Sequence, residues 1–432
     1  MKLFKIIILF TLLYFLPGKT NAQENWVFYS KTINVKDYGG DNFRLVAMVR
    51  SEPQDDSASA RLWVRADKKN GMGFFDNMWD KPIRNEEWKT YSIDGKIDTG
   101  AYQLAFGALC QYNGKFYYDD IKLDVETSKG KWKTIFTDDF ENNSDTLERG
   151  QYGFNNDYTA TIIDAGNKSK VLLIEGNNVP NYGVNNKVGK FADVNGIKMY
   201  YEIYGSGKPL LMIHGNGGSI DAFTKTIPYF SKIYKVIAVD SRAQGRSEDD
   251  NDSLSFEMMA DDFASLLDTL HIDSAYVIGW SDGGINALLL AIRHPEKVIK
   301  LAATGANITP DSTAFAEGVW QDSKRYYDTS YNKTWKTKQE KNAWKLFLLD
   351  WNQPNITLEQ LHTIKCPSLI ICGDHDVISV EHTVLIYKNI PQAYLWVLPN
   401  SRHATLWMYP DEFNKKVDDF FSMPFHVYVH SH

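Results

Sequence analysis

Cysteine is scarce in this 432-residue chain, and there is no excess of positive charge. The three cysteines, Cys110, Cys366 and Cys372, are too few and too scattered for a disulfide framework or a cysteine-rich zinc site. Lys and Arg number 47 against 54 Asp and Glu, a formal net charge of −7, so we expect no nucleic-acid partner. Hydrophobic residues make up 43% of the chain and charged residues 23%, which is typical of a globular protein with two or three domains.

The long apolar run at the start of the chain predicts a secretory signal peptide over residues 1–22. Lys2 and Lys5 precede an apolar stretch over 6–16, and the small-residue end at 20–22 is an acceptable cleavage site. That stretch is about half the length that a membrane span needs. We therefore expect cleavage, no stable membrane anchor, and a secreted or periplasmic protein. A bridge between Cys366 and Cys372 is conceivable there, although Cys372 continues an apolar run and is expected to be a buried thiol.

Residues 23–180 have the pattern of an antiparallel β-sandwich. Short alternating segments rich in Val, Tyr, Phe and Trp are separated by Gly, Asn and Asp. The strands we expect are 43–49, 60–65, 103–107 and 116–123. Residues 88–91 and 118–123 resemble the jelly-roll, galactose-binding-like modules found beside many secreted enzymes, and the resemblance covers about residues 26–126. It implies an all-β domain that can bind carbohydrate.

Five residues of this first domain carry the possible ligand sites. Trp63, Trp79 and Tyr112 could stack on sugar rings, but the interpretation we favour is that they pack the sandwich and its loops. Asp119 and Asp120 could help to hold a structural calcium ion, although two adjacent carboxylates fall far short of the six to eight oxygen ligands that calcium takes.

Residues 188–424 have a different pattern, in which short apolar runs alternate with amphipathic helices. This predicts an α/β fold with a doubly wound, mostly parallel sheet that helices cover on both faces. Asn195-Gly196 is a strong hairpin signal between two strands at the start. The parallel strands we expect are Leu210–Ile213, Lys235–Val239, Ala275–Ile278, Ile299–Ala303, Leu369–Cys372 and Tyr394–Leu398.

The segment Gly279-Trp280-Ser281-Asp282-Gly283 fits the G-x-S-x-G nucleophile elbow, and it lies between an apolar strand and an amphipathic helix. A sharp strand-to-helix turn forces the serine into a strained backbone conformation, and only residues without side chains fit two positions on either side. The pattern therefore predicts Ser281 as a nucleophile.

A serine hydroxyl needs a base, and the base needs an acid that orients it. Asp376 follows the strand Leu369–Cys372, and His403 follows the strand Tyr394–Leu398, so both lie at carboxyl ends of strands, where such sheets place their ligands. We predict His403 as the base and Asp376 as the acid. Asp374 is the alternative acid, but we expect its side chain to stabilise the turn in which it lies.

Two backbone N–H groups are expected to form an oxyanion hole. Asp282 follows the nucleophile and would supply one of them, and Asn216 in the loop His214-Gly215-Asn216-Gly217-Gly218 would supply the other. The alternative for this glycine-rich loop is phosphate binding, but the loop lacks both the P-loop ending and the dinucleotide spacing.

These motifs, in this order, resemble the α/β-hydrolase superfamily over about 235 residues, with Ala243 in a turn where the family usually has glycine. The resemblance implies a helical cap at about 308–361. Gly279–Ile285 and Gly305–Asn307 look like the valacyclovirase, or biphenyl-hydrolase-like, esterases, which act on esters of α-amino acids. That likeness gives Asp282 a possible second role in binding a substrate ammonium group, while the alternative is that its charge offsets the helix dipole. Trp280 and Trp320 are the other residues expected to contact substrate.

The sequence thus predicts a serine hydrolase that cleaves small carboxylic esters through an acyl-enzyme, with no cofactor and no metal. Carbon–carbon bond hydrolysis and perhydrolysis remain alternatives, because both use the same triad. An alternative of another class is a glycan-binding protein with a vestigial hydrolase half.

Overall fold

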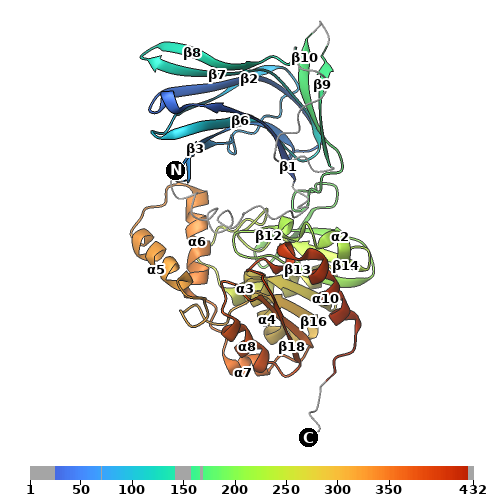
Figure 1. Ribbon diagram of the computed structural model, residues 1–432. Coiled ribbons are helices and arrows are strands. Elements are labelled where there is room, and N and C mark those ends of the chain that lie inside the picture. Colours follow the sequence, from blue (N-terminus) through green and yellow to red (C-terminus); the bar gives the residue numbers. More distant parts are fainter. Residues whose placement is uncertain (1–24, 70, 142–156, 166–168, 427–432) are drawn as a thin grey trace. The chain divides into compact units, whose positions relative to one another are not determined.

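The computed structural model describes residues 25–69, 71–141, 157–165 and 169–426. The predicted signal peptide lies outside these residues. The chain forms two compact units that divide after Pro180, and each unit is described by itself (Figure 1). No helix in the described residues is both long and apolar enough to cross a membrane.

Unit 1 contains two antiparallel sheets that enclose one apolar core. The first sheet has the order β1-β6-β3-β4, and its strands are Trp26–Asn34, Ala101–Gln111, Ser59–Lys68 and Gly71–Asp76. The second sheet has the order β5-β2-β7-β10-β9, and its strands are Lys89–Lys96, Asn42–Pro53, Gly114–Ser128, Lys170–Gly176 and Tyr158–Asp164. A sixth strand, β8 (Lys131–Asp138), also pairs with β7. The four predicted strands fall within β2, β3, β6 and β7, and the all-β class is confirmed. The closer likeness to a jelly-roll module stays a prediction.

Alternation along β3 explains which of its side chains enter this core. Ala60, Leu62 and Val64 are fully buried in it, as expected for one face of a strand. Trp63 points to the opposite face, yet it is only 7% exposed, and its indole N–H donates to the Tyr29 carbonyl at 3.2 Å. Trp63 therefore packs within the domain, which is the interpretation that the sequence favoured, whereas Trp79 is 60% exposed.

The carboxylates proposed for calcium are occupied by local contacts. Asp119 accepts the backbone N–H of Asp120 at 2.8 Å and the hydroxyl of Ser169 at 3.4 Å, and burial raises its pKa. Within the described residues no group of three or more His, Cys, Asp or Glu side chains is placed to hold a metal ion. The calcium hypothesis therefore finds no ligand set there.

Unit 2 is built on an eight-stranded sheet with the order β11-β12-β14-β13-β15-β16-β17-β18. The first two strands form the predicted hairpin around Asn195 and Gly196, and the pairs from β13–β14 to β17–β18 are parallel. In sequence order the strands are Lys190–Val194, Ile197–Tyr204, Lys208–Ile213, Tyr234–Val239, Ala275–Trp280, Val298–Thr304, Ser368–Gly373 and Ala393–Leu398. The predicted doubly wound sheet is confirmed, and all six expected parallel strands lie within these bounds.

Helices cover both faces of this sheet because apolar residues recur along one side of each helix. One core includes residues of α3 (Phe256–Thr269), α4 (Asp282–Arg293) and α8 (Val380–Lys388). The other includes residues of α2 (Ile227–Phe230), α9 (Thr405–Met408) and α10 (Pro410–Ser422). Cys366 and Cys372 are free, buried thiols.

The buried carboxylate of Glu202 holds the start of unit 2 against the sheet. It accepts the backbone N–H groups of Gly183 and Asn185, each at 2.8 Å, and the hydroxyls of Tyr200 and Tyr204, each at 2.7 Å. Four donors satisfy the charge of this buried group, which would otherwise be costly. Unit 2 thus begins at Asn181, before the expected start at residue 188.

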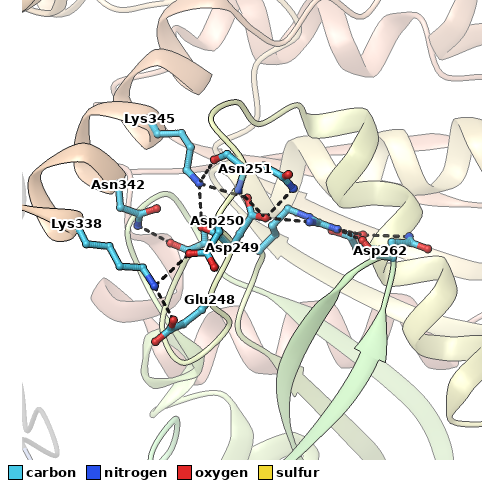
Figure 2. A network of polar contacts seen from close by, with 11 residues as sticks. Glu248, Asp249, Asp250, Asn251, Asp262, Lys338, Asn342 and Lys345 are labelled. Carbon is cyan, nitrogen blue, oxygen red and sulfur yellow. Dashed lines mark hydrogen bonds and ion pairs between the residues drawn. The ribbon is translucent and has the colours of Figure 1, made fainter.

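Between β16 and β17 the chain forms the cap, with helices α5 (Val319–Ser330), α6 (Lys338–Asn352) and α7 (Leu358–His362). A polar network ties α6 to the loop after β14 (Figure 2). Lys345 donates to the carbonyl of Asn251 at 2.8 Å and to the carboxylate of Asp249 at 3.3 Å. Arg242, only 2% exposed, contacts the same carboxylate and forms a two-pronged ion pair with Asp262 at 2.6 and 2.8 Å.

We expect Lys345→Met to lower the free energy of unfolding of unit 2 by about 2 kcal/mol, because the buried Asp249 loses one of its two cationic partners. Its matched control is Lys338→Met on the same helix, since the ion pairs of Lys338 with Glu248 and Asp250 are exposed and screened by solvent. Urea denaturation measures both. Equal effects of the two substitutions would contradict the anchoring role of Lys345.

Candidate active site

The turn from β15 to α4 lifts Ser281 out of the sheet. Ser281 has φ 58° and ψ −120°, the strained conformation predicted for a nucleophile elbow. A Cβ at Gly279 would lie 2.1 Å from the Gly283 carbonyl oxygen, and a Cβ at Gly283 would lie 1.9 Å from the Ile213 carbonyl oxygen. Side chains cannot fit at either position, so the two glycines allow the strand and the helix to approach closely enough for the turn.

The structure brings Ser281, His403 and Asp376 together at the carboxyl ends of three strands. Nε2 of His403 lies 2.9 Å from the hydroxyl oxygen of Ser281, and Nδ1 lies 2.6 Å from a carboxylate oxygen of Asp376. The Asp376 side chain is fully buried and also accepts the backbone N–H of Ile378 at 3.1 Å. These contacts allow one ring nitrogen of His403 to accept a proton from Ser281 while the other is held by the acid.

The electrostatics of the site favour a basic imidazole. Burial by itself lowers the pKa of His403, but the charge and the hydrogen bond of Asp376, together with the charge of Asp282, raise it above the usual 6.5. His403 is therefore a stronger base than a histidine in water.

The rival residues have other partners. Asp374 accepts the backbone N–H groups of Asn400 and Ser401, each at 2.9 Å, which lowers its pKa and ties two loops together. His382 is buried and accepts the backbone N–H of Ile308 at 3.0 Å.

The glycine-rich loop passes directly beside the nucleophile. A Cβ at Gly215 would lie 3.0 Å from Cβ of Ser281. His214 fixes the loop, because its Nε2 accepts the Ser241 N–H at 3.0 Å, which leaves Nδ1 to donate to the Gly215 carbonyl at 2.7 Å. The loop therefore lies where a donor to a carbonyl oxygen on Ser281 is needed.

A pair of acidic side chains adjoins the triad. Asp282 is 3% exposed, accepts a hydrogen bond from the Asn216 side-chain amide at 3.0 Å, and is hydrogen-bonded to Asp350 of α6. Burial raises the pKa of Asp282 to about 6. Burial and the charge of Asp282 raise the pKa of Asp350 well above its ordinary range.

Sequence reasoning missed Asp350. It lies in a polar helix, where the sequence pattern predicts that a single carboxylate faces the solvent. A signal was present in its position at the end of the apolar run Leu346-Phe347-Leu348-Leu349, the segment that packs against the body.

The two tryptophans expected to touch substrate differ in position. The indole N–H of Trp280 donates to the His403 carbonyl at 3.0 Å, and its ring centroid lies 6.0 Å from that of His403. Trp320 stacks on Trp351 within the cap, at 5.7 Å between centroids, and Tyr327 stacks on Trp351 at 4.7 Å. The structure therefore places Trp280 beside the triad and Trp320 in the aromatic packing of the cap.

Comparisons with known proteins agree with this geometry. Residues 208–335 match the family model described as the alpha/beta hydrolase fold. Unit 2 has the alpha/beta hydrolase fold. Serine hydrolase BPHL of Homo sapiens is 28% identical over 254 residues, which are 52% of this chain and 84% of that protein. The 2-hydroxymuconate semialdehyde hydrolase of Pseudomonas sp. (strain CF600) is 35% identical over 139 residues, which are 31% of this chain and 49% of that protein.

Among solved structures, a meta-cleavage product hydrolase is 24% identical and covers 55% of this chain and 99% of its own, with a TM-score of 0.46. The predicted resemblance of unit 2 to the biphenyl-hydrolase-like serine hydrolases is confirmed by its similarity to serine hydrolase BPHL, and the chain is a hydrolase.

Gly305 leaves no room for a side chain beside His403. It has φ +66°, and a Cβ there would lie 2.7 Å from Cε1 of His403. We expect Gly305→Ala to displace the imidazole and lower the hydrolytic turnover of p-nitrophenyl acetate roughly a hundredfold.

Gly196→Ala is the matched control for Gly305→Ala, because Gly196 has φ +83° but no atom within 4 Å of its Cβ position. It carries the same backbone cost without the contact, so we expect a loss of stability and nearly normal turnover. Similar turnover in the two variants would contradict the steric explanation.

Proposed function

We propose that this chain is a serine hydrolase that cleaves small carboxylic esters, with α-amino-acid esters as its favoured class. The observation that carries the proposal is the contact of 2.9 Å between Ser281 and His403, with Asp376 at 2.6 Å on the other side of the ring. Ser281 is the nucleophile, His403 the general base and acid, and Asp376 the group that orients His403.

The reaction proceeds in two halves. The Ser281 oxygen attacks the ester carbonyl while Nε2 of His403 takes its proton. The carbon–oxygen bond to the alcohol then breaks, and His403 returns the proton to the departing oxygen. Water attacks the acyl-enzyme in the same way, so the carboxylic acid leaves and Ser281 is regenerated. No metal or organic cofactor takes part in this sequence.

The negative oxygen of each tetrahedral intermediate needs donors. The backbone N–H groups of Asp282 and Asn216 are the pair we assign. The close approach of Gly215 to Ser281 supports this assignment, because it brings the loop backbone to the reacting carbon.

The acidic pair supports an ammonium-bearing substrate. Two carboxyl groups lie together beside the nucleophile, and neither of them has a Lys or Arg partner among the described residues. An ammonium group on the α-carbon of the acyl part would pair with Asp282, since opposite charges attract strongly in a semi-buried site. Trp280 and Trp320 are proposed to line the remainder of the acyl site.

Carbon–carbon bond hydrolysis of dienone acids is the second candidate, supported by the similarity to 2-hydroxymuconate semialdehyde hydrolase. Its substrates carry carboxylates, which Asp282 and Asp350 would repel. For this reason we rank it below ester hydrolysis. Perhydrolysis would use the same triad, with peroxide in place of water.

A vestigial hydrolase half would leave the chain as a binding protein. The aligned triad supports an active enzyme instead. Labelling of the folded protein with a fluorophosphonate probe separates the two, because the probe reacts with an activated serine and Ser281→Ala gives the blank. An absence of label would favour the binding protein.

We also propose that the enzyme acts outside the cytosol, as a secreted or periplasmic protein. This proposal rests on residues 1–22 of the sequence alone.

The acid limb of activity tests the roles of the two aspartates. We expect kcat/KM for p-nitrophenyl acetate to rise with pH through an apparent pKa above 6.5, because His403 must be neutral to accept a proton and Asp376 raises its pKa. Asp376→Asn should lower kcat by roughly 10³- to 10⁴-fold. Asp374→Asn should keep the same pH dependence of kcat/KM and most of the activity. A larger loss of activity in Asp374→Asn than in Asp376→Asn would instead make Asp374 the acid.

Substrate choice tests the role of the acidic pair. We expect kcat/KM for an ester of phenylalanine to exceed that for the ester of 3-phenylpropanoic acid, which lacks only the amino group. Asp282→Asn should abolish a preference of about tenfold or more, while it changes the hydrolysis of the second ester little. In the wild type the preference should fall as the pH drops through about 6, where Asp282 takes up a proton. An unchanged preference in Asp282→Asn would remove the ammonium role and leave the esterase proposal intact.

A further inference from the structure

Strand β16 carries no residue of the proposed triad, yet its carboxyl end contacts all three segments that do. The carbonyl of Thr304, the last residue of β16, accepts the backbone N–H of Ser281 at 2.8 Å. The backbone N–H of Gly305 donates at 3.0 Å to the carbonyl of Ile371 in β17, the strand that leads to the acid of the triad. Gly305 also packs against the imidazole of His403. Because β16 lies between β15 and β17 in the sheet, its end is placed to set the spacing of the triad.

A pair of buried hydroxyls joins this end of β16 to the segment that carries the base. The hydroxyl oxygens of Thr304 and Thr405 lie 2.8 Å apart, and both residues are fully buried. Thr405 is the first residue of α9 and follows His403 by two positions. Each hydroxyl is the partner of the other, and a buried hydroxyl without a partner would be costly. Thr304 therefore contacts the nucleophile through its carbonyl and the segment of the base through its side chain.

Other contacts hold the segment of His403 at different points. The indole of Trp280 donates to the His403 carbonyl at 3.0 Å, and Asp374 accepts the backbone N–H of Ser401 at 2.9 Å. These two contacts fix the loop before His403 and the carbonyl of the residue itself. The hydroxyl pair adds a contact at Thr405, on the C-terminal side of the base.

We propose that Thr304 and Thr405 are positioning residues, and that their hydrogen bond sets the distance between Ser281 and His403. This role rests on the proposed function, in which His403 takes the proton of Ser281. The hydrogen bond holds the two oxygens at 2.8 Å, whereas two methyl groups in contact lie about 3.5–4.0 Å apart. Methyl groups in place of both hydroxyls would therefore move the start of α9 away from β16 by about 1 Å. A displacement of that size can lower turnover about a hundredfold.

The experiment replaces both hydroxyls by methyl groups in the full chain, as Thr304→Val combined with Thr405→Val. Two apolar groups of the same shape leave no hydroxyl unsatisfied, so we expect a melting temperature near that of the wild type. The kcat for p-nitrophenyl acetate should fall by about tenfold to a hundredfold, with KM nearly unchanged. Labelling by a fluorophosphonate probe should slow by a similar factor, because it also needs the base beside the serine. Thr304→Ser keeps the hydroxyl and should keep the turnover of the wild type.

Thr383→Val is the matched control for the loss of a buried hydroxyl. Thr383 is 1% exposed, and its hydroxyl donates to the Ser379 carbonyl at 3.3 Å at the start of α8. This variant should keep the turnover of the wild type, whatever stability it loses.

The possible outcomes separate the positioning role from a structural role. A folded double variant with the turnover of the wild type would overturn the positioning role and leave the proposed function intact. A loss of turnover that follows the melting temperature across all variants would also overturn it. If the wild type neither hydrolyses the ester nor takes the label, the proposed function fails and the positioning role fails with it. If the double variant does not fold, Thr405→Val alone decides, and turnover equal to that of the wild type would overturn the role.

Discussion

The active site depends on how closely the backbone can pack at the turn between β15 and α4. The carbonyl oxygens of Gly283 and Ile213 occupy the places that side chains at Gly279 and Gly283 would need. This contact brings the end of β13, the end of β15 and the first turn of α4 to one point. Ser281 consequently lies at the edge of the sheet where the ends of β17 and β18 bring Asp376 and His403. The order of the strands therefore places Asp376 and His403 beside Ser281, the residue with the strained backbone.

Much of unit 2 was predictable because its signals are local. Apolar runs mark strands that are buried on both faces, and acidic or basic residues directly after such runs lie at the carboxyl edge of the sheet. Ser281, Asp376 and His403 could be assigned on that basis. Asp350 was missed, because its role depends on a contact with Asp282, 68 positions earlier in the sequence. The apolar run before Asp350 indicates that the helix packs against the body, but it does not identify the partner of the carboxylate.

In unit 1 the sequence predicted burial on only one face of a strand. The alternation of residues in β3 identifies the side chains that enter the core, but it does not show what covers the opposite face of the strand. Trp63 was expected to pack in the sandwich, with stacking on sugar as the alternative, and it is only 7% exposed. Buried charged groups also differ in their surroundings. Arg242 pairs with Asp249 and Asp262, and four neutral hydrogen-bond donors surround Glu202. Asp282 and Asp350 have no Lys or Arg partner among the described side chains, and they lie at the site that we propose for the substrate.

The network in Figure 2 links the cap to the body at one turn of the chain. Lys345 and Asp350 lie on the same helix, five residues apart, so the contacts that seat the helix also fix the depth at which its acidic group meets Asp282. Ala243 stands in that turn with φ +64°, and its carbonyl accepts the side-chain amide of Asn342 from the same helix. In the proposed function, substrate choice thus depends jointly on two distant stretches of sequence. If α6 were replaced by the corresponding helix of a relative, the new helix would lack its matching loop after β14. Both segments would have to be exchanged together to keep the selectivity.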